Sequence, residues 1–237
     1  MWLVPEYEPV RKIAICFVHD FFNTRFGYGK TLCEIIRASH ATAEVELWIS
    51  PEDLPFFQEE CSRYHVSLDE VTLNIPGPGR AIIAEYAPNF ARDDDGSLYG
   101  LVYRNPLTEQ PEEKKVFAQQ WTAQLGMSRL DLGFDFATAH LLVNEELVLL
   151  SSYFFEGEDR QARLKFFSDH FPRQKFEVVP PLAGDLTTDL DMYLWPIAPK
   201  VWIVSEYAPG TAQPASLAPT LEIILKHGHT VHRVPGL

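Results

Sequence analysis

Residues 175–204, which read KFEVVPPLAGDLTTDLDMYLWPIAPKVWIV, decide the fold. The first part, KFEVVPP, predicts a β-strand that ends at a proline pair and follows a predicted helix at 157–170. The same helix-then-strand pattern ends in TVHRVPG at 230–236 and, less clearly, in VTLNIPG at 71–77. A supersecondary unit that recurs at a spacing of roughly 50 residues indicates an internally repeated fold.

The predicted elements follow the order β-β-α-β, repeated with variation. This order favours an α/β architecture of repeated units over a doubly wound sheet. No low-complexity linker divides the sequence, so we predict a single domain. That domain spans residues 1–237, and its approximate units are 1–78, 79–130, 131–180 and 181–237.

The composition excludes several classes of protein. The formal net charge of −13 argues against a nucleic-acid partner, because phosphate binding needs clustered Lys and Arg. No apolar run is long enough to cross a bilayer, and the N-terminus lacks the order of a signal peptide. The three cysteines, Cys16, Cys33 and Cys61, are not spaced like a metal or redox motif. We read them as buried thiols in a reducing compartment and expect a cytoplasmic protein without a membrane partner.

Two motifs could suggest a cofactor. RFGYGKTL at 25–32 follows a predicted strand, but a phosphate-binding loop needs a glycine where Thr24 stands. His227, His229 and His232 could suggest zinc, yet the last two are an odd number of residues apart and face opposite sides of a strand. We therefore predict no nucleotide, no metal and no other cofactor.

The densest group of acids lies inside the opening stretch. Asp185, Asp189 and Asp191 fall within seven residues of each other. If DLDMY is a strand, Asp189 and Asp191 project to the same face beside an apolar segment. Two such carboxylates repel each other unless a cation, a proton or a substrate lies between them. The pattern favours a site for a cationic ligand, and a solvated turn or sheet edge is the alternative.

A second acidic segment is ARDDDGSLYG at 91–100. Its Asp and Gly residues occupy positions typical of a β-turn. The functional alternative is that Arg92 holds a carboxylate at the mouth of a pocket. The residues alone leave both interpretations open.

Four segments, in the same order along the chain, resemble the agmatine deiminase and bacterial peptidylarginine deiminase family. PEYEPVRKIAICF at 5–17 is similar to its opening P-x-E-x-x-P pattern, and NFARDDDGSLYGLVY at 89–103 to its aRDyGP segment. FDFATAHLLVNEELVLLSS at 134–152 resembles its EGGN segment, and DLDMYLWPIAPKVWIV at 189–204 its H-x-D segment. The resemblance covers nearly the whole chain.

The resemblance implies a pentein fold, in which five ββαβ units surround a central channel that holds the active site. Members of the family hydrolyse a guanidinium group to a ureido group and ammonia through a cysteine thiolate. Two carboxylates bind the guanidinium nitrogens, and a histidine is the general acid and base. These roles agree with the affinity of carboxylates for a planar cation and with thiolate nucleophilic catalysis.

Matched residue by residue, the resemblance implies ligand-binding roles for Arg92, Asp93 and Asp191. Asp189 stands at the position of the catalytic histidine, which is a departure from the family pattern. Ala137, Thr138 and Ala139 stand in place of EGG, and His140 stands at the Asn position. We expect His140 and Asp185 to contribute to the same site.

The family's nucleophilic cysteine belongs to the fifth unit, whereas this chain ends where the fourth unit would end. We therefore expect a pentein-like fold with four of five units, and a deiminase-family protein without activity of its own. The alternative is a non-catalytic protein that binds a guanidino or other cationic small molecule, an arginyl peptide or a protein partner. A metal-dependent hydrolase using the carboxylates is a third candidate. Because an open ring exposes strand edges, we also expect association with another copy or a partner chain.

Overall fold

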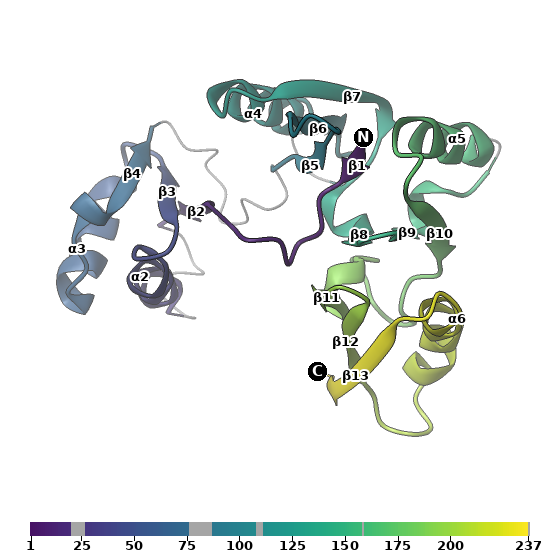
Figure 1. Ribbon diagram of the computed structural model, residues 1–237. Coiled ribbons are helices and arrows are strands. Elements are labelled where there is room, and N and C mark those ends of the chain that lie inside the picture. Colours follow the sequence, from purple (N-terminus) through teal and green to yellow (C-terminus); the bar gives the residue numbers. More distant parts are fainter. Residues whose placement is uncertain (20–26, 76–86, 108–110, 158, 237) are drawn as a thin grey trace. The chain divides into compact units, whose positions relative to one another are not determined.

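The computed structural model describes residues 1–19, 27–75, 87–107, 111–157 and 159–236. The chain divides into two compact units, drawn together in Figure 1. Unit 1 comprises Met1–Glu8 and Glu85–Leu237, and unit 2 comprises Pro9–Ala84. Unit 2 is therefore an insertion between the first strand of unit 1 and the rest of it.

Unit 2 has a three-stranded parallel sheet in the order β2-β3-β4. Its elements are β2 (Lys12–Phe17), α2 (Tyr28–Ser39), β3 (Glu44–Ile49), α3 (Leu54–Tyr64) and β4 (Val71–Asn74), with a 3-10 turn η1 at Leu68–Glu70. The helices pack against each other and bury an apolar cluster that includes Cys33 and Cys61. Cys16 is also buried, and its neighbours in β2, Ile15 and Phe17, belong to the same cluster. The glycine-containing loop at 25–32 lies partly outside the described residues, as does the end of VTLNIPG.

Unit 1 contains three consecutive ββαβ repeats, as the sequence predicts. The first repeat consists of β5 (Asn89–Arg92), β6 (Leu98–Arg104), α4 (Pro111–Gln124) and β7 (Ser128–Asp135). The second consists of β8 (Leu141–Asn144), β9 (Leu147–Ser151), α5 (Arg160–His170) and β10 (Lys175–Val179). The third consists of β11 (Leu194–Ala198), β12 (Val201–Glu206), α6 (Gln213–Lys226) and β13 (Thr230–Pro235).

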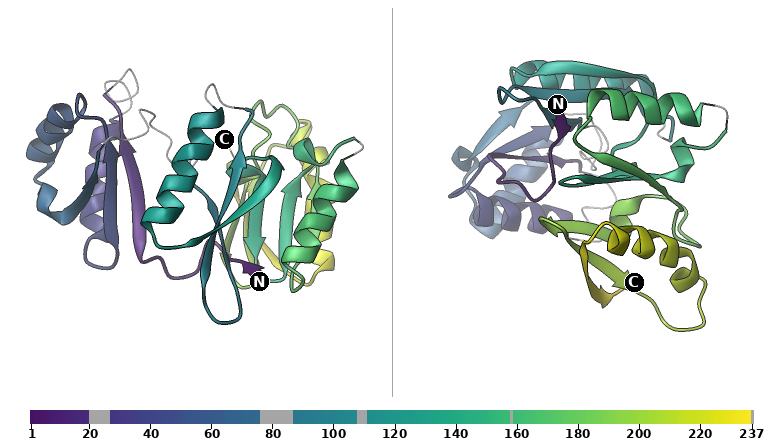
Figure 2. Two further views of the ribbon diagram at one scale, coloured as in Figure 1. Left: turned by 90° about the horizontal axis from the view of Figure 1, so that it is seen from above. Right: turned by 45° about the vertical axis from the view of Figure 1, so that its right-hand side comes forward.

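Each repeat builds its own sheet in the same way. The first two strands form an antiparallel hairpin, and the helix then returns the chain so that the third strand pairs in parallel with the second. Figure 2 shows each of the three helices running alongside its own strands. The first sheet has an extra strand, β1 (Trp2–Leu3), which pairs with β5 in antiparallel register. The repeat is therefore present both in the sequence and in the sheet topology.

The N-terminal strand is further attached to the second repeat by Gln174. The side-chain oxygen of Gln174 accepts a hydrogen bond from the Leu3 amide at 2.7 Å, and its nitrogen donates to the Leu3 carbonyl at 3.1 Å. The same nitrogen donates to the Glu145 carbonyl at 2.8 Å. This amide side chain thus replaces the ladder partner that Leu3 lacks on that side.

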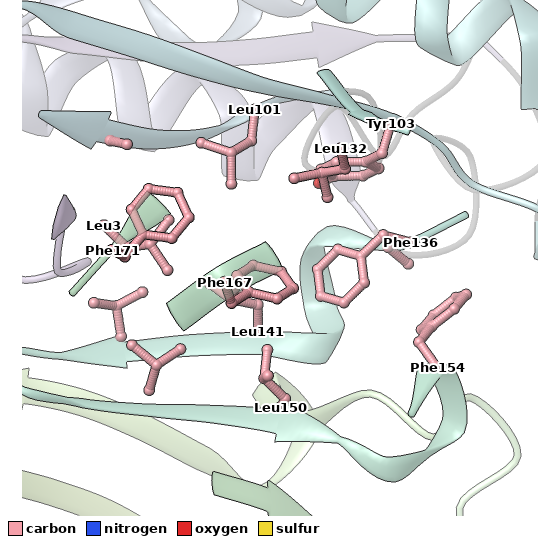
Figure 3. Packing of buried hydrophobic residues seen from close by; sticks show 14 of the residues in the cluster. Leu3, Leu101, Tyr103, Leu132, Phe136, Leu141, Leu150, Phe154, Phe167 and Phe171 are labelled. Atoms are coloured by element: carbon pink, nitrogen blue, oxygen red, sulfur yellow. The ribbon is translucent and has the colours of Figure 1, made fainter. Parts of the chain in front are cut away.

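The largest core of unit 1 lies between the first and second sheets and is rich in phenylalanine. Figure 3 shows Phe167 of α5 facing Phe136 and Leu141, with Leu150 below. The ring of Phe167 has six aromatic neighbours, with ring centroids 5.3–6.1 Å away. A second core, centred on Trp202, fills the space between the second and third sheets.

The DLDMY segment is not a strand, so that part of the sequence-based prediction is wrong. Residues Leu190–Met192 form a 3-10 turn, η5, and β11 begins only at Leu194. Leu190 and Tyr193 are buried, and their spacing of three residues fits a 3-10 turn, in which residues three apart share a face. In the part of the chain that the structure describes, no helix is long and apolar enough to span a membrane.

Candidate functional site

A histidine and an aspartate from two short turns meet in unit 1. His140 ends the 3-10 turn η3 (Thr138–His140), and its side chain is completely buried. Its Nε2 atom lies 3.0 Å from Oδ1 of Asp189, whose side chain is 27% exposed. Neither ring nitrogen makes an aligned hydrogen bond within the described residues. A buried imidazole without hydrogen bonds is unusual, because burying a polar group normally requires a partner.

The backbone before Asp189 is built to direct its side chain toward His140. Thr188 has a positive φ of 60°, a conformation that is uncommon and costly for a residue other than glycine. Its carbonyl accepts a hydrogen bond from the Ser151 hydroxyl at 3.3 Å, which ties this turn to the end of β9. After Asp189, Leu190 inserts into the core beside Trp202. The strained residue and the buried leucine together fix where Asp189 points.

Two further carboxylates, Asp191 and Glu6, add negative charge to the same place. Both residues are exposed by surface area, yet enough protein atoms surround each carboxyl group to desolvate it in part. Partial desolvation, and then the charge of Asp189, raise the pKa of Asp191 to about 6, although His140 offsets part of this effect. Desolvation and the charge of Asp191 raise the pKa of Glu6 to about 7. Asp191 is thus coupled electrostatically to Asp189 and to Glu6, since like charges raise the pKa of a carboxyl group.

The sequence-based prediction of the site did not include Glu6. This residue follows β1, whose pairing with β5 attaches the N-terminal segment to the edge of the first sheet. The neighbouring Tyr7 hydroxyl donates to Asn144 Oδ1 at 3.3 Å and holds the segment there. The only sequence signal was that Glu6 falls inside the PEYEP segment that resembles the family's opening pattern.

Asp185 lies near the cluster but is engaged in its own turn. Its Oδ1 accepts hydrogen bonds from the Thr187 amide at 3.0 Å and the Thr187 hydroxyl at 2.8 Å. Its Oδ2 is buried and has no hydrogen-bond partner among the described residues. The charge of Asp185 is a minor contribution to the raised pKa of Asp191. It therefore belongs to the electrostatic surroundings of the site.

Arg92 and Asp93 lie in the hairpin between β5 and β6, where the β-turn interpretation accounts for their contacts. Asp93 accepts hydrogen bonds from the Ser97 amide at 3.1 Å and the Tyr99 hydroxyl at 2.9 Å. Arg92 pairs with Glu8 at 3.0 Å. None of these contacts joins Asp93 to Asp189 or Asp191. The ligand-binding roles predicted for Arg92 and Asp93 stay predictions.

The cysteines belong to unit 2, and the C-terminal histidines make contacts of their own. Cys16, Cys33 and Cys61 are all buried in unit 2, and contact with the Cys33 thiol, together with burial, raises the pKa of Cys61. His229 accepts a hydrogen bond from Trp202 at 3.0 Å, and His227 lies 2.9 Å from Glu177. Over the described ranges, no three His, Cys, Asp or Glu side chains are arranged to hold a metal ion. The metal-dependent alternative therefore has no support from the described side chains.

Comparison with known structures identifies the fold. The chain superposes on an agmatine deiminase of C. jejuni with a TM-score of 0.75 at 14% identity, over 98% of this chain and 72% of the other. It superposes on the agmatine deiminase of Enterococcus faecalis with a TM-score of 0.74 at 16% identity, over 99% and 70% of the two chains. No family model and no curated protein sequence matches the chain. The fold is that of the agmatine deiminases, which confirms the pentein-type α/β fold predicted from the sequence.

Proposed function

We propose that this chain binds a cationic guanidino ligand, such as agmatine, arginine or peptidyl-arginine, through Asp189, Asp191 and Glu6. We further propose that it does not hydrolyse this ligand by itself. The likeness to agmatine deiminases supports the ligand class, since agmatine carries a guanidinium group. The observation that carries the proposal is the group of mutually repelling carboxylates beside a buried imidazole.

No Lys or Arg of the described residues balances the charge of Asp191 and Glu6 in this cluster. Asp191 and Glu6 form no ion pair with a Lys or Arg of the described residues, whereas carboxylates elsewhere in the chain do. A bound cation would relieve the repulsion that raises their pKa values. A guanidinium suits this role because it is planar and has five N–H donors. Two of these donors can form parallel hydrogen bonds with the two oxygens of one carboxylate.

Three features support binding without hydrolysis. The thiols of the described cysteines are buried in unit 2, and a thiolate is the nucleophile in the family that the chain resembles. Asp189 stands where the resemblance implies the catalytic histidine. The imidazole nearest to it, from His140, is completely buried and so is not placed to exchange protons with solvent.

The first test is a titration with agmatine, followed by isothermal calorimetry and thermal shift. We expect saturable binding to the wild-type chain and at least about tenfold weaker binding to Asp191→Asn, because a hydrogen bond to a charged group contributes about 1.5–3 kcal/mol. Asp169→Asn is the matched control. It removes the same charge from an exposed pair with Lys165 on α5 and should bind agmatine like the wild type.

Two results would contradict the proposal in different ways. If agmatine, arginine and an arginyl peptide all fail to bind at millimolar concentration, the binding function is wrong. Release of ammonia and a ureido product by the purified chain would show a working deiminase, and the non-catalytic part would then be wrong. Asp93→Asn, measured in parallel, tests whether Asp93 also contacts the ligand, as the resemblance implies.

The pH dependence of stability provides an independent prediction. The folded-state pKa values of about 6 for Asp191 and about 7 for Glu6 exceed the ordinary values of 3.8 and 4.5 for these side chains. Between about pH 4 and 7 the folded chain therefore binds protons that the unfolded chain has released, so these two groups make stability fall as pH rises. We expect the melting temperature of the double variant Glu6→Gln/Asp191→Asn to increase relative to that of the wild type as the pH rises from about 4 to 7. A difference that is constant from pH 4 to 8 would contradict the shared repulsion.

A further inference from the structure

Tyr153 is an exposed aromatic residue beside the candidate site. It lies in the 3-10 turn η4 (Ser152–Phe154) that follows β9. Its two C-terminal neighbours, Phe154 and Phe155, are buried in the core, whereas Tyr153 is 47% exposed. Core packing therefore explains the positions of Phe154 and Phe155, but it does not explain why the Tyr153 ring is exposed.

Two contacts place Tyr153 close to Asp189. The centroid of its ring lies 5.6 Å from that of His140, whose Nε2 is 3.0 Å from Asp189 Oδ1. On the backbone side, Ser151 Oγ donates to the carbonyl of Thr188, the residue before Asp189, and accepts from the Tyr153 amide at 3.4 Å. The turn that carries Tyr153 and the turn that carries Asp189 are thus joined through one serine and one imidazole.

A second observation indicates that this place accommodates a ligand. The His140 side chain is fully buried between Tyr153, Phe154 and Asp189, and its Nδ1 has no hydrogen-bond partner in the described part of the chain. Asp189 contacts His140, whereas Asp191 and Glu6 form no ion pair with a Lys or Arg within the same described residues. The cluster therefore combines carboxylates without Lys or Arg partners, a buried imidazole whose Nδ1 lacks a hydrogen bond, and an exposed aromatic ring.

We propose that the ring of Tyr153 is one wall of the cation site and makes the site select a planar guanidinium over a compact ammonium. The inference rests on the proposed function, to which it adds a specificity-determining residue. A guanidinium is weakly hydrated and stacks on aromatic rings while its edge donates to carboxylates. An ammonium is a strongly hydrated point charge that gains less from the ring and loses more of its hydration.

The test compares two ligands that have equal charge and similar length. Agmatine and 1,5-diaminopentane both carry a terminal ammonium, and they differ in the group at the other end. We expect the wild type and Tyr153→Phe to prefer agmatine by a similar factor in calorimetric titrations. In Tyr153→Leu, agmatine should bind about three- to thirty-fold more weakly, while the affinity for 1,5-diaminopentane stays within twofold.

The outcomes separate this inference from the function on which it rests. If the wild type binds neither ligand, both the proposed function and the role of Tyr153 are wrong. If the wild type binds agmatine but Tyr153→Leu keeps the same preference, or loses both ligands equally, the role of Tyr153 alone is wrong. Tyr153→Met, measured in the same way, repeats the comparison should the leucine variant not fold.

Discussion

Replacing Phe167 with alanine should lower the free energy of unfolding of unit 1 by about 3–5 kcal/mol. The side chain is fully buried, and the six aromatic rings around it belong to this core or pack against it. Figure 3 shows two of them, Phe136 and Phe171. Because these rings come from both the first and the second repeat, they cannot all move inward to fill the space. Urea unfolding followed by far-UV circular dichroism measures the loss.

The neighbouring residue Phe166 is the control for this substitution. It lies on the same helix, α5, but its side chain is only partly buried. Phe166→Ala changes helix propensity in the same way and removes the same atoms, so a clearly smaller loss is expected. If the two variants lose equal stability, the core does not lie where the structure places it.

Replacing Asn144 with alanine should lower the free energy of unfolding by about 2–4 kcal/mol. Asn144 is completely buried at the end of β8. Its Nδ2 donates to the carbonyls of Ala198 and Val201 at 3.3 and 3.2 Å, and its Oδ1 accepts from the Lys200 amide at 2.8 Å. Alanine would leave these backbone groups of the β11–β12 turn buried and unpaired, which is the costly way to lose a hydrogen bond.

Asn89→Ala is the matched variant, because among the described residues the Asn89 side chain accepts one hydrogen bond, from the Tyr103 hydroxyl at 2.9 Å. We expect it to lose about 1 kcal/mol. The side-chain oxygen of Asn144 also accepts a hydrogen bond from the Tyr7 hydroxyl. Asn144→Ala should therefore also weaken agmatine binding, because it releases the segment that carries Glu6. Equal losses of stability in the two variants would show that Asn144 does not organise the turn.

The repeated fold could be predicted from the sequence because its signals are local. Strand, helix and strand follow one another within each repeat, and an apolar run such as KVWIV identifies β12 without knowledge of its partners. Gly126 follows α4 with a φ of 68°, a conformation that favours glycine after the end of a helix. The expected association with another chain stays a prediction.

The arrangement of the site could be predicted only in part. Asp189 and Asp191 were identified from their density, but the alternation of DLDMY suggested a strand, whereas burial of Leu190 and Tyr193 produces a 3-10 turn. Asp189 therefore contacts His140, and the charge of Asp191 raises the pKa of Glu6. These interactions join residues that are 49 and 185 positions apart, and the periodicity of a single sequence does not predict interactions over such separations.

The attachment of Leu3 to Gln174 sets an order for folding during synthesis. Unit 2 is formed from one continuous segment and can complete its sheet as soon as β4 has left the ribosome. Strand β1 leaves the ribosome first, whereas β5 and Gln174, which hold its hydrogen-bond partners, are synthesised much later. The N-terminal residues must therefore remain unpaired while an entire unit forms beside them, and closing unit 1 becomes a late, non-local step.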